Sequence, residues 1–293
     1  MTKGKGAVDI RFWLIQSFNG ISYGALLFLV GSGLSLIFGV MRIVNLAHGS
    51  YFLLGGYVAL SVIWTTGSWA LAIPVAALTI AAADLLMERI FLRPLGFDPL
   101  RQVLLTVGFA FLFQQAALDI WGGNNMDINP PEALTRSIVI GGVYLPLYRV
   151  FMISMALMIG VVLWLVMEKT RMGAAVRATV DDAEMARGVG IDTSRISMFI
   201  FALGAFLAAL GGVIGGAFLG IYPGLDFEIL PLAFAVVIIG GMGSLTGAAI
   251  GALAVGLADN FGKALFPEIS YFTLYAPMVL ILAVKPTGLF GRE

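Results

Sequence analysis

The sequence predicts an all-α membrane protein, a polytopic bundle of about eight to nine transmembrane helices. Hydrophobic residues make up 60% of its 293 residues, charged residues only 12%, and the mean hydropathy is +0.98. An ordinary soluble domain has about 45 to 50% apolar and about 25% charged residues. Apolar, charge-poor runs recur along the chain at about the 20-residue length that a bilayer core requires. A transmembrane barrel is a remote second choice, because its strands would show short alternating segments.

Nine apolar segments are the candidate spans. The first follows Lys3, Lys5 and Arg11 and could imitate a signal peptide, but it continues too far without a cleavage site, so we interpret it as a retained span. The second and the eighth segments are short and follow Gly-rich breaks, so one or both are expected to be half-helices that enter and leave on one side. The segments are Phe12–Phe38, Ser50–Trp64, Trp69–Met87, Gln102–Trp121, Val150–Met167, Ile196–Ile221, Ile229–Gly241, Leu245–Phe261 and Tyr271–Val284.

The charges of the loops predict the orientation, because short loops rich in Lys and Arg stay in the cytoplasm. The loops 168–195 and 89–101 carry several basic residues each, so both are expected inside. The loop 122–147 between them has few basic residues and is expected outside, and counting onward places the C-terminal segment inside. Counting backward places the N-terminus outside, against its own basic residues, so the side of the N-terminus stays open.

Composition excludes several kinds of site. The chain has no cysteine and a single histidine, so disulfides, thiolate metal sites and histidine clusters are not expected. Its zero net charge argues against nucleic acid as a partner. No G-x-x-x-x-G-K-[ST] phosphate loop occurs, so any ATP energy must come from another chain. No nucleophile, base and orienting group are recognisable together, so neither a catalytic residue nor a cofactor is expected.

A polar segment, "VNLAHGSYFLLGG", interrupts the apolar sequence. An unwound stretch inside a membrane is tolerated only where protein or a watery cavity surrounds it. Asn45, His48 and Ser50 are therefore expected to cap the helix that begins near Ser50 and to face a translocation pathway, where a helix N-terminus attracts carboxylates. The alternative is a satisfied buried cluster that only stabilises the break. Farther along, Asp84 and Glu88 are expected to snorkel or to pair with neighbouring arginines.

Two further pairs of polar residues are pathway candidates. Gln114 and Gln115 lie within one span and face the same two alternatives. Ser244 and Thr246 belong to "MGSLTGAAIGALAVGL", which echoes "HGSYFLLGGYVAL" because each places Gly-Ser before a helix of small residues. Such paired segments often mark an inverted repeat with the pathway at its interface. The alternative is that Gly and Ala only allow close helix packing.

The loop 168–195 contains a second helical pattern. Asp181 followed three residues later by Glu184 is an N-cap and N3 pair, which predicts a short helix over 182–187. That helix is expected to end at one of the two glycines that follow it. A solvated loop helix is the alternative, but a short capped helix between two spans also suits docking onto a cytosolic partner. The small and apolar residues for such docking are Ala183, Met185, Ala186 and Val189.

This loop also carries a family resemblance. The segment "EMARGVGIDTSRISMFIF" is similar to the pattern E-A-A-x3-G-x9-I-x-L-P of ABC-importer permeases. Two departures occur: Met185 replaces an alanine, and the terminal Leu-Pro is missing, with Leu203 at the position of the proline. Together with "GVMRIVNLAHGSYFLLGGY", "IIGGMGSLTGAAIG" and "KPTGLFGR", it resembles the LivH-type permease of branched-chain amino acid ABC importers over essentially the whole chain. The resemblance implies that ATPase coupling involves Asp181, Asp182, Ala183, Glu184, Ala186 and Gly190.

The resemblance further implies one permease domain over 1–293 in a bacterial inner membrane. Its expected partners are a LivM-like paralogous permease, two cytosolic ATPase subunits and a periplasmic solute-binding protein. The substrates would be branched-chain amino acids or a related small polar solute such as urea, an amide or an aromatic acid. The alternatives are a secondary transporter, against which the scarcity of midspan charges weighs, and a passive channel for a small neutral solute.

Overall fold

The computed structural model describes residues 10–41, 44–96, 98–140, 142–285 and 287–291. Most of these residues are helical, and one antiparallel hairpin pairs β1 (Ser137–Ile140) with β2 (Val143–Pro146), which confirms the all-α class. The helices are α1 (Ile10–Met41), α2 (His48–Thr66), α3 (Trp69–Met87), η1 (Glu88–Leu92), η2 (Arg93–Leu95), α4 (Pro99–Trp121), η3 (Glu132–Leu134), α5 (Leu147–Lys169), α6 (Arg171–Asp181), α7 (Ala183–Gly188), α8 (Thr193–Leu219), α9 (Leu225–Gly240), α10 (Leu245–Leu265), η4 (Pro267–Ile269) and α11 (Ser270–Val284).

Six helical segments of the described chain are long and apolar enough to cross a membrane, which makes this a multi-pass membrane protein. They are α1, α3 with its continuation to Leu95, α4, α5, α8 and α10. The remaining apolar helices, α2, α9 and α11, are not among them, so the expected number of eight or nine crossings stays a prediction. Helix α10 has 21 residues and the length of a full span, although the sequence predicted it as short.

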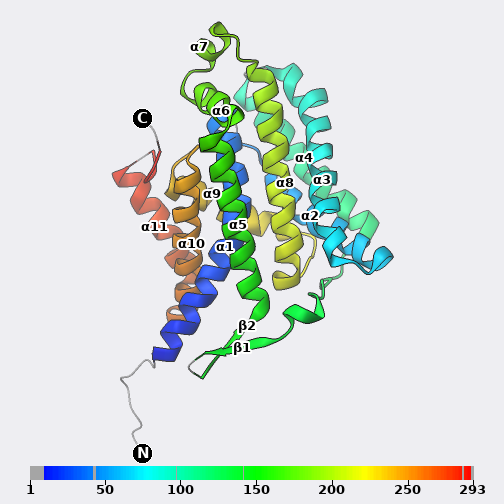
Figure 1. The fold of residues 1–293 in the computed structure, drawn as a ribbon, viewed down its shortest axis with the longest axis vertical. Coiled ribbons are helices and arrows are strands. Elements are labelled where there is room, and N and C mark those ends of the chain that lie inside the picture. Colours follow the sequence, from blue (N-terminus) through cyan, green and yellow to red (C-terminus); the bar gives the residue numbers. More distant parts are fainter. Residues whose placement is uncertain (1–9, 42–43, 97, 141, 286, 292–293) are drawn as a thin grey trace, which may run out of the picture.

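The two ends of the molecule are clearly different. Helices α6 and α7 lie at one end, and the β1–β2 hairpin and the start of α1 lie at the other (Figure 1). The C-terminal segment belongs to the first end, because Phe290 lines a cavity together with Arg177 of α6. Lys3 and Lys5, whose charge bears on the orientation, lie outside the described residues.

Polar side chains determine where six of the helices begin. The first N–H groups of a helix have no intrahelical acceptor, and a Ser, Thr or Asp just before the helix can supply one. Such side chains accept backbone N–H groups at the starts of α3, α4, α6, α7, α8 and α10. The capping residues are Ser68, Asp98, Thr170, Asp182, Asp192 and Ser244.

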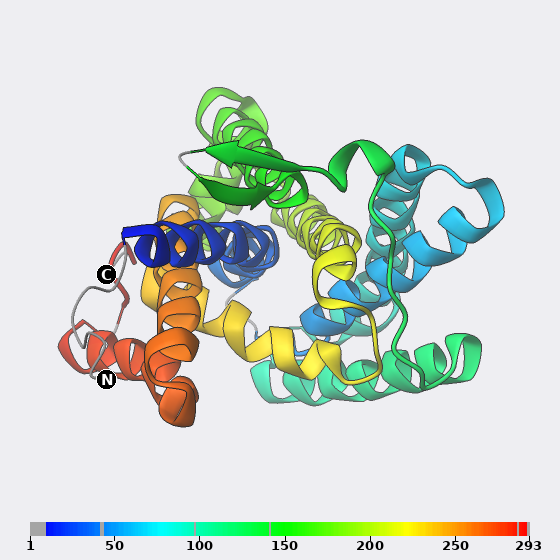
Figure 2. The ribbon, with the colours of Figure 1, turned by 90° about the horizontal axis from the view of Figure 1, so that it is seen from below.

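Helices α1 and α8 form the centre of the bundle. They cross where Gly33 lies against Gly204, and a Cβ atom at position 33 would lie 2.7 Å from the carbonyl oxygen of Gly204. Small residues therefore bring the two backbones together, as is typical of membrane helices. Helix α1 also packs against α9 and α10, and α8 packs against α2 and α3, while α4 and α11 lie at opposite edges (Figure 2).

Two pairs of helices pack and begin in a similar way, but they are not the segments that the sequence paired. Helix α3 packs on α8 as α10 packs on α1, and each begins after a Gly with positive φ, Gly67 (69°) or Gly243 (77°), followed by a capping serine. Ser50, which was matched with Ser244, instead lies inside α2. The reason is that α2 begins at His48, two residues before the expected start.

Candidate functional site

The segment before α2 folds back into the bundle. The imidazole Nε2 of His48 donates a 3.0 Å hydrogen bond to the carbonyl oxygen of Val30, which lies 11 residues before the end of α1. At 1.5 Å per residue this contact is roughly 16 Å below the end of α1, so α2 begins well inside the protein. Asn45 Oδ1 accepts the N–H of Ala47, the N-cap residue, whose own side chain makes no cap. Asn45, His48 and Ser50 are fully buried in this chain.

Ser50 connects α2 to an acidic residue that the sequence analysis did not select. Its hydroxyl donates a 3.0 Å hydrogen bond to Oδ2 of Asp226, in the first turn of α9. A Cβ atom at position 49 would lie 2.5 Å from the backbone oxygen of Asp226, so only a glycine allows the two helix starts to touch. The N-termini of α2 and α9 therefore meet at one buried junction. The signal in the sequence was a pair of acids, Asp226 and Glu228, inside an otherwise apolar segment, "YPGLDFEILPLAFAVV".

The expectation that Asp84 and Glu88 reach the membrane surface is wrong. Asp84 is fully buried and Glu88 is 3% exposed. The hydroxyl of Tyr51 donates a 2.5 Å hydrogen bond to Oδ1 of Asp84, so the carboxyl group is held by α2 and not by an arginine. No ion pair joins either carboxylate to an arginine in the described residues. Tertiary packing of α2 on α3 explains the difference at Asp84, because it covers the helix face that carries this acid.

Gln114 and Gln115 lie apart from this junction. They belong to α4, an edge helix of which few residues are buried. Gln115 is exposed and its Nε2 donates to Oδ1 of Asp119 at 2.9 Å, one turn farther along, while Gln114 is half-buried. The structure therefore does not bring these glutamines together with Asn45, His48 and Ser50, and their role in a pathway stays a prediction.

The loop 168–195 contains two helices, of which the sequence predicted one. Residues of the first, α6, form a separate helix that ends at Asp181, and the cap of α7 is therefore Asp182. Its Oδ1 accepts the N–H groups of Glu184 and Met185, both at 2.9 Å. The predicted cap at Asp181 is wrong by one residue, because that residue completes the preceding helix. Gly190 ends the turn after α7 with a φ of +89°.

Fewer of the predicted docking residues around α7 are exposed than the sequence suggested. Met185 is 65% and Val189 is 71% exposed, so both are available for docking. Ala186 is 3% exposed and packs inside the chain, which removes it from the docking surface expected for it. Ala183 is half-buried. Two large apolar side chains at the tip of an otherwise polar loop are typical of a surface that another protein covers.

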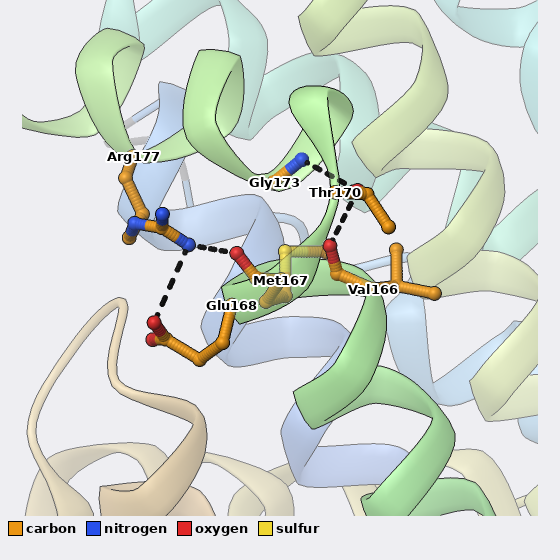
Figure 3. A network of polar contacts seen from close by, with 6 residues as sticks. All are labelled: Val166, Met167, Glu168, Thr170, Gly173 and Arg177. Carbon is orange, nitrogen blue, oxygen red and sulfur yellow. Dashed lines mark hydrogen bonds and ion pairs between the residues drawn. The ribbon is translucent and has the colours of Figure 1, made fainter.

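A network of hydrogen bonds fixes α6 to the end of α5 (Figure 3). The hydroxyl of Thr170 donates to the carbonyl oxygen of Val166 at 2.6 Å and accepts the N–H of Gly173 at 3.1 Å. The guanidinium of Arg177 donates to the carbonyl oxygen of Met167 and lies 3.7 Å from the carboxylate of Glu168. Two of the last four carbonyl groups of α5, which have no intrahelical donors, are thereby satisfied. We call these six residues the elbow.

A cavity separates α6 from the opposite helices. Its volume is about 800 Å³, and its walls include Arg177, Val180 and Asp181 on one side and the turn before α10 on the other. Ser244, the cap of α10, and Thr246, in its first turn, line this cavity, so the structure brings them together with Asp181 and not with the buried junction. Ser244 Oγ accepts the N–H of Gly247 at 3.0 Å as the cap of α10.

Comparison with known proteins identifies the family. The family described as "Branched-chain amino acid transport system / permease component" matches residues 16–282, which include both the buried junction and the elbow. The chain belongs to this permease family. The permease protein BraD of Pseudomonas aeruginosa, named for high-affinity branched-chain amino acid transport, is 29% identical, with 97% of each chain covered. LivH of Escherichia coli, named in the same way, is 31% identical, with 96% of each chain covered.

The chain is also similar to a more distant relative. LivM of Escherichia coli, a permease protein of the same named transport system, is 27% identical over 89% of this chain and 67% of its own length. No solved structure matches the chain significantly. These relatives are permease components of transport systems, so the LivH-type resemblance predicted from the sequence is confirmed.

Proposed function

We propose that this permease is the membrane-spanning subunit of an importer that cytosolic ATPases drive through α7. The observation that carries the proposal is the combination of an exposed apolar tip, Met185 and Val189, with the elbow that fixes α6 to α5. A force on the tip would reach α5 through hydrogen bonds and not through a flexible loop. The absence of a phosphate loop from the sequence agrees with a partner that binds the ATP.

The proposed lever has a second attachment. Arg187 Nε donates a 2.7 Å hydrogen bond to the hydroxyl of Thr193 at the start of α8, one of the two central helices. The cavity gives α6 room to approach the cap of α10 at Ser244 and Thr246. A stroke at α7 would thus reach the helices that enclose the buried junction. In this proposal Asn45, His48, Ser50, Gln114, Gln115, Ser244 and Thr246 face the pathway, and Asp181, Asp182, Ala183, Glu184, Ala186 and Gly190 form or support the docking segment.

The distribution of charge supports a cytosolic position for α6 and α7. Most described basic residues lie at this end of the bundle, and loops rich in Lys and Arg stay inside. We infer that the protein lies in the inner membrane, with its C-terminal segment inside and the start of α1 outside. We further propose that α1–α4 and α8–α11 form an inverted repeat. The basic residues at the α6–α7 end are Arg89, Arg93, Arg101, Lys169, Arg171, Arg177, Arg187, Arg195 and Lys285, and those at the hairpin end are Arg11, Arg136, Arg149 and Lys263.

The names of the relatives support the substrate and partners of this proposal. BraD and LivH are named for branched-chain amino acid transport, so we propose these amino acids, or a related small polar solute, as the cargo. The similarity to LivM supports pairing with a LivM-like paralogous permease. The importer would be completed by two cytosolic ATPase subunits and a periplasmic solute-binding protein, which delivers the solute.

Uptake into membrane vesicles tests the proposal. Vesicles that contain this permease, its paralogue and the ATPases should accumulate radiolabelled leucine only with ATP inside and the binding protein outside. Vesicles without the ATPase subunits serve as the matched control and should show no accumulation. Equal leucine entry in both preparations would reject an ATP-driven importer and support the passive channel or the secondary transporter.

A further inference from the structure

Seven buried side-chain polar atoms have no hydrogen-bond partner in the described part of the chain, and three of them lie on α2 and α9, the helices that form the junction. These three are Nδ1 of His48, the hydroxyl of Tyr57 and Oδ1 of Asp226, and none of the three residues is more than 2% exposed. A buried polar group without a partner has given up its hydrogen bonds to water without replacing them, which destabilises the folded protein. Such groups are rare in folded proteins, and each calls for an explanation such as a ligand or an ordered water.

The junction combines a positive helix end with a negative side chain. The first N–H groups of α2 carry partial positive charge, and no side chain caps them from Ala47. The carboxylate of Asp226, on α9, lies at this helix start, because the hydroxyl of Ser50 in the first turn of α2 donates to its Oδ2 at 3.0 Å. Tyr57 lies seven residues beyond Ser50, or about two turns farther along α2. The hydrogen-bond donors at the start of α2 and the acceptor carboxylate of Asp226 are therefore neighbours, joined by the hydrogen bond from Ser50.

An α-amino acid has the complementary charges on a single carbon atom. Helix N-termini bind carboxylates, and an ionised carboxylate binds an ammonium group through strong hydrogen bonds. We propose that the first turn of α2 binds the α-carboxylate of a transported amino acid and that Asp226 binds its α-ammonium. The inference rests on the proposed function, because the junction must open during transport for the solute to enter.

In the closed junction, the hydroxyl of Ser50 donates the hydrogen bond to Asp226 that the ammonium group would donate in the complex. Opening would therefore exchange one donor for another. Oδ1 of Asp226 and the hydroxyl of Tyr57 remain available for the additional hydrogen bonds that a three-donor ammonium can make. Urea, neutral amides and carboxylic acids lack this group. The subsite therefore selects amino acids among the solutes considered for this permease.

Ligand-dependent thermal stability of the purified permease–ATPase complex, without its binding protein, tests the inference. The probes are leucine, 4-methylpentanoate, which lacks the ammonium, and 3-methylbutylamine, which lacks the carboxylate. Leucine should raise the melting temperature at concentrations at least tenfold lower than either analogue. Asp226→Asn should remove this preference. The matched control is Glu228→Gln, which changes an exposed carboxylate on the same helix that accepts a 2.9 Å hydrogen bond from Tyr222.

Several outcomes would overturn the inference. An Asp226→Asn complex that responds to leucine as the wild type does, or a wild type that responds equally to all three probes, contradicts the subsite. Asp226→Glu keeps the charge and should retain the leucine preference; if it assembles but loses the preference as Asp226→Asn does, charge recognition is wrong. Failure of the proposed function would appear differently, as a purified permease without ATPase subunits or as uptake that does not need ATP.

Discussion

Replacing Gly173 with alanine should separate ATP hydrolysis from transport, because it disturbs the elbow alone. A Cβ atom at this position would overlap the carbonyl oxygens of Val166 and Met167, well inside the 3.0 Å that Cβ atoms keep from other heavy atoms. Both obstacles are backbone atoms, so the side chains cannot relieve the overlap. Helix α6 must therefore move away from the end of α5.

The expected cost follows from the bonds that this movement breaks. The hydroxyl of Thr170 makes two of them and the guanidinium of Arg177 makes the third. At about 0.5–1.5 kcal/mol each they contribute roughly 1.5–4.5 kcal/mol, and the higher helix propensity of alanine returns about 1 kcal/mol. The net loss is about 0.5–3.5 kcal/mol. Since about 1.4 kcal/mol corresponds to a factor of ten, a loss near the middle of this range should lower solute uptake per ATP hydrolysed by about tenfold to thirtyfold.

Reconstituted proteoliposomes provide the assay, with ATP hydrolysis and leucine uptake measured in the same preparation. The matched control is Gly108→Ala in α4, where a Cβ atom meets nothing within 4 Å. This control should leave the ratio of uptake to hydrolysis unchanged. An unchanged ratio in Gly173→Ala, with the complex intact, would refute the role of the elbow as a rigid connection.

Three further changes test other parts of the molecule. Gly190→Val places a side chain at a φ of +89° in open space, so it should cost about 1–2 kcal/mol of local strain and lower uptake relative to ATP hydrolysis, while membrane levels measured by immunoblot stay constant. Met185→Asp combined with Val189→Asp should abolish copurification of the ATPases without removing the subunit from the membrane, and full recovery of the ATPases would contradict a docking role for α7. Tyr51→Phe leaves Asp84 buried without its donor, which should destabilise the purified protein by about 1–3 kcal/mol; an unchanged melting temperature would contradict a structural role for this hydrogen bond.

The apolar segments were predictable because membrane helices need a minimum apolar length. Eight of the nine predicted segments start within three residues of the first residue of a helix, as Trp69–Met87 does for α3, and the ninth, Ile229–Gly241, starts four residues into α9. Helix α6 was missed because its polar, amphipathic sequence has no such length requirement and resembles a solvated loop. That omission also shifted the predicted cap of α7 from Asp182 to Asp181. A cap is assigned reliably only when the end of the preceding helix is known.

The polar contacts of the site could not be predicted, since they join distant parts of the chain. Ser50 and Asp226 are separated by 176 residues, and only the packing of α2 against α9 brings them together. The packing of α2 on a different helix, α3, buries Asp84, which the sequence of α3 alone placed near the membrane surface. Ala186 shows the opposite error, a buried residue that the sequence analysis assigned to the surface. Its small side chain suited either a docking surface or the buried side of α7. Periodicity identifies the helix but not the neighbour that covers each face.

The labelling of a single cysteine at the tip of α7 tests the central claim most directly. The chain contains no native cysteine, so Met185→Cys introduces the only reactive thiol. A membrane-impermeant maleimide should label it in inside-out vesicles but not in right-side-out vesicles, and addition of the ATPase subunits should protect it. Labelling from the external side, or equal labelling with and without bound ATPases, would contradict a cytosolic lever that the ATPases drive.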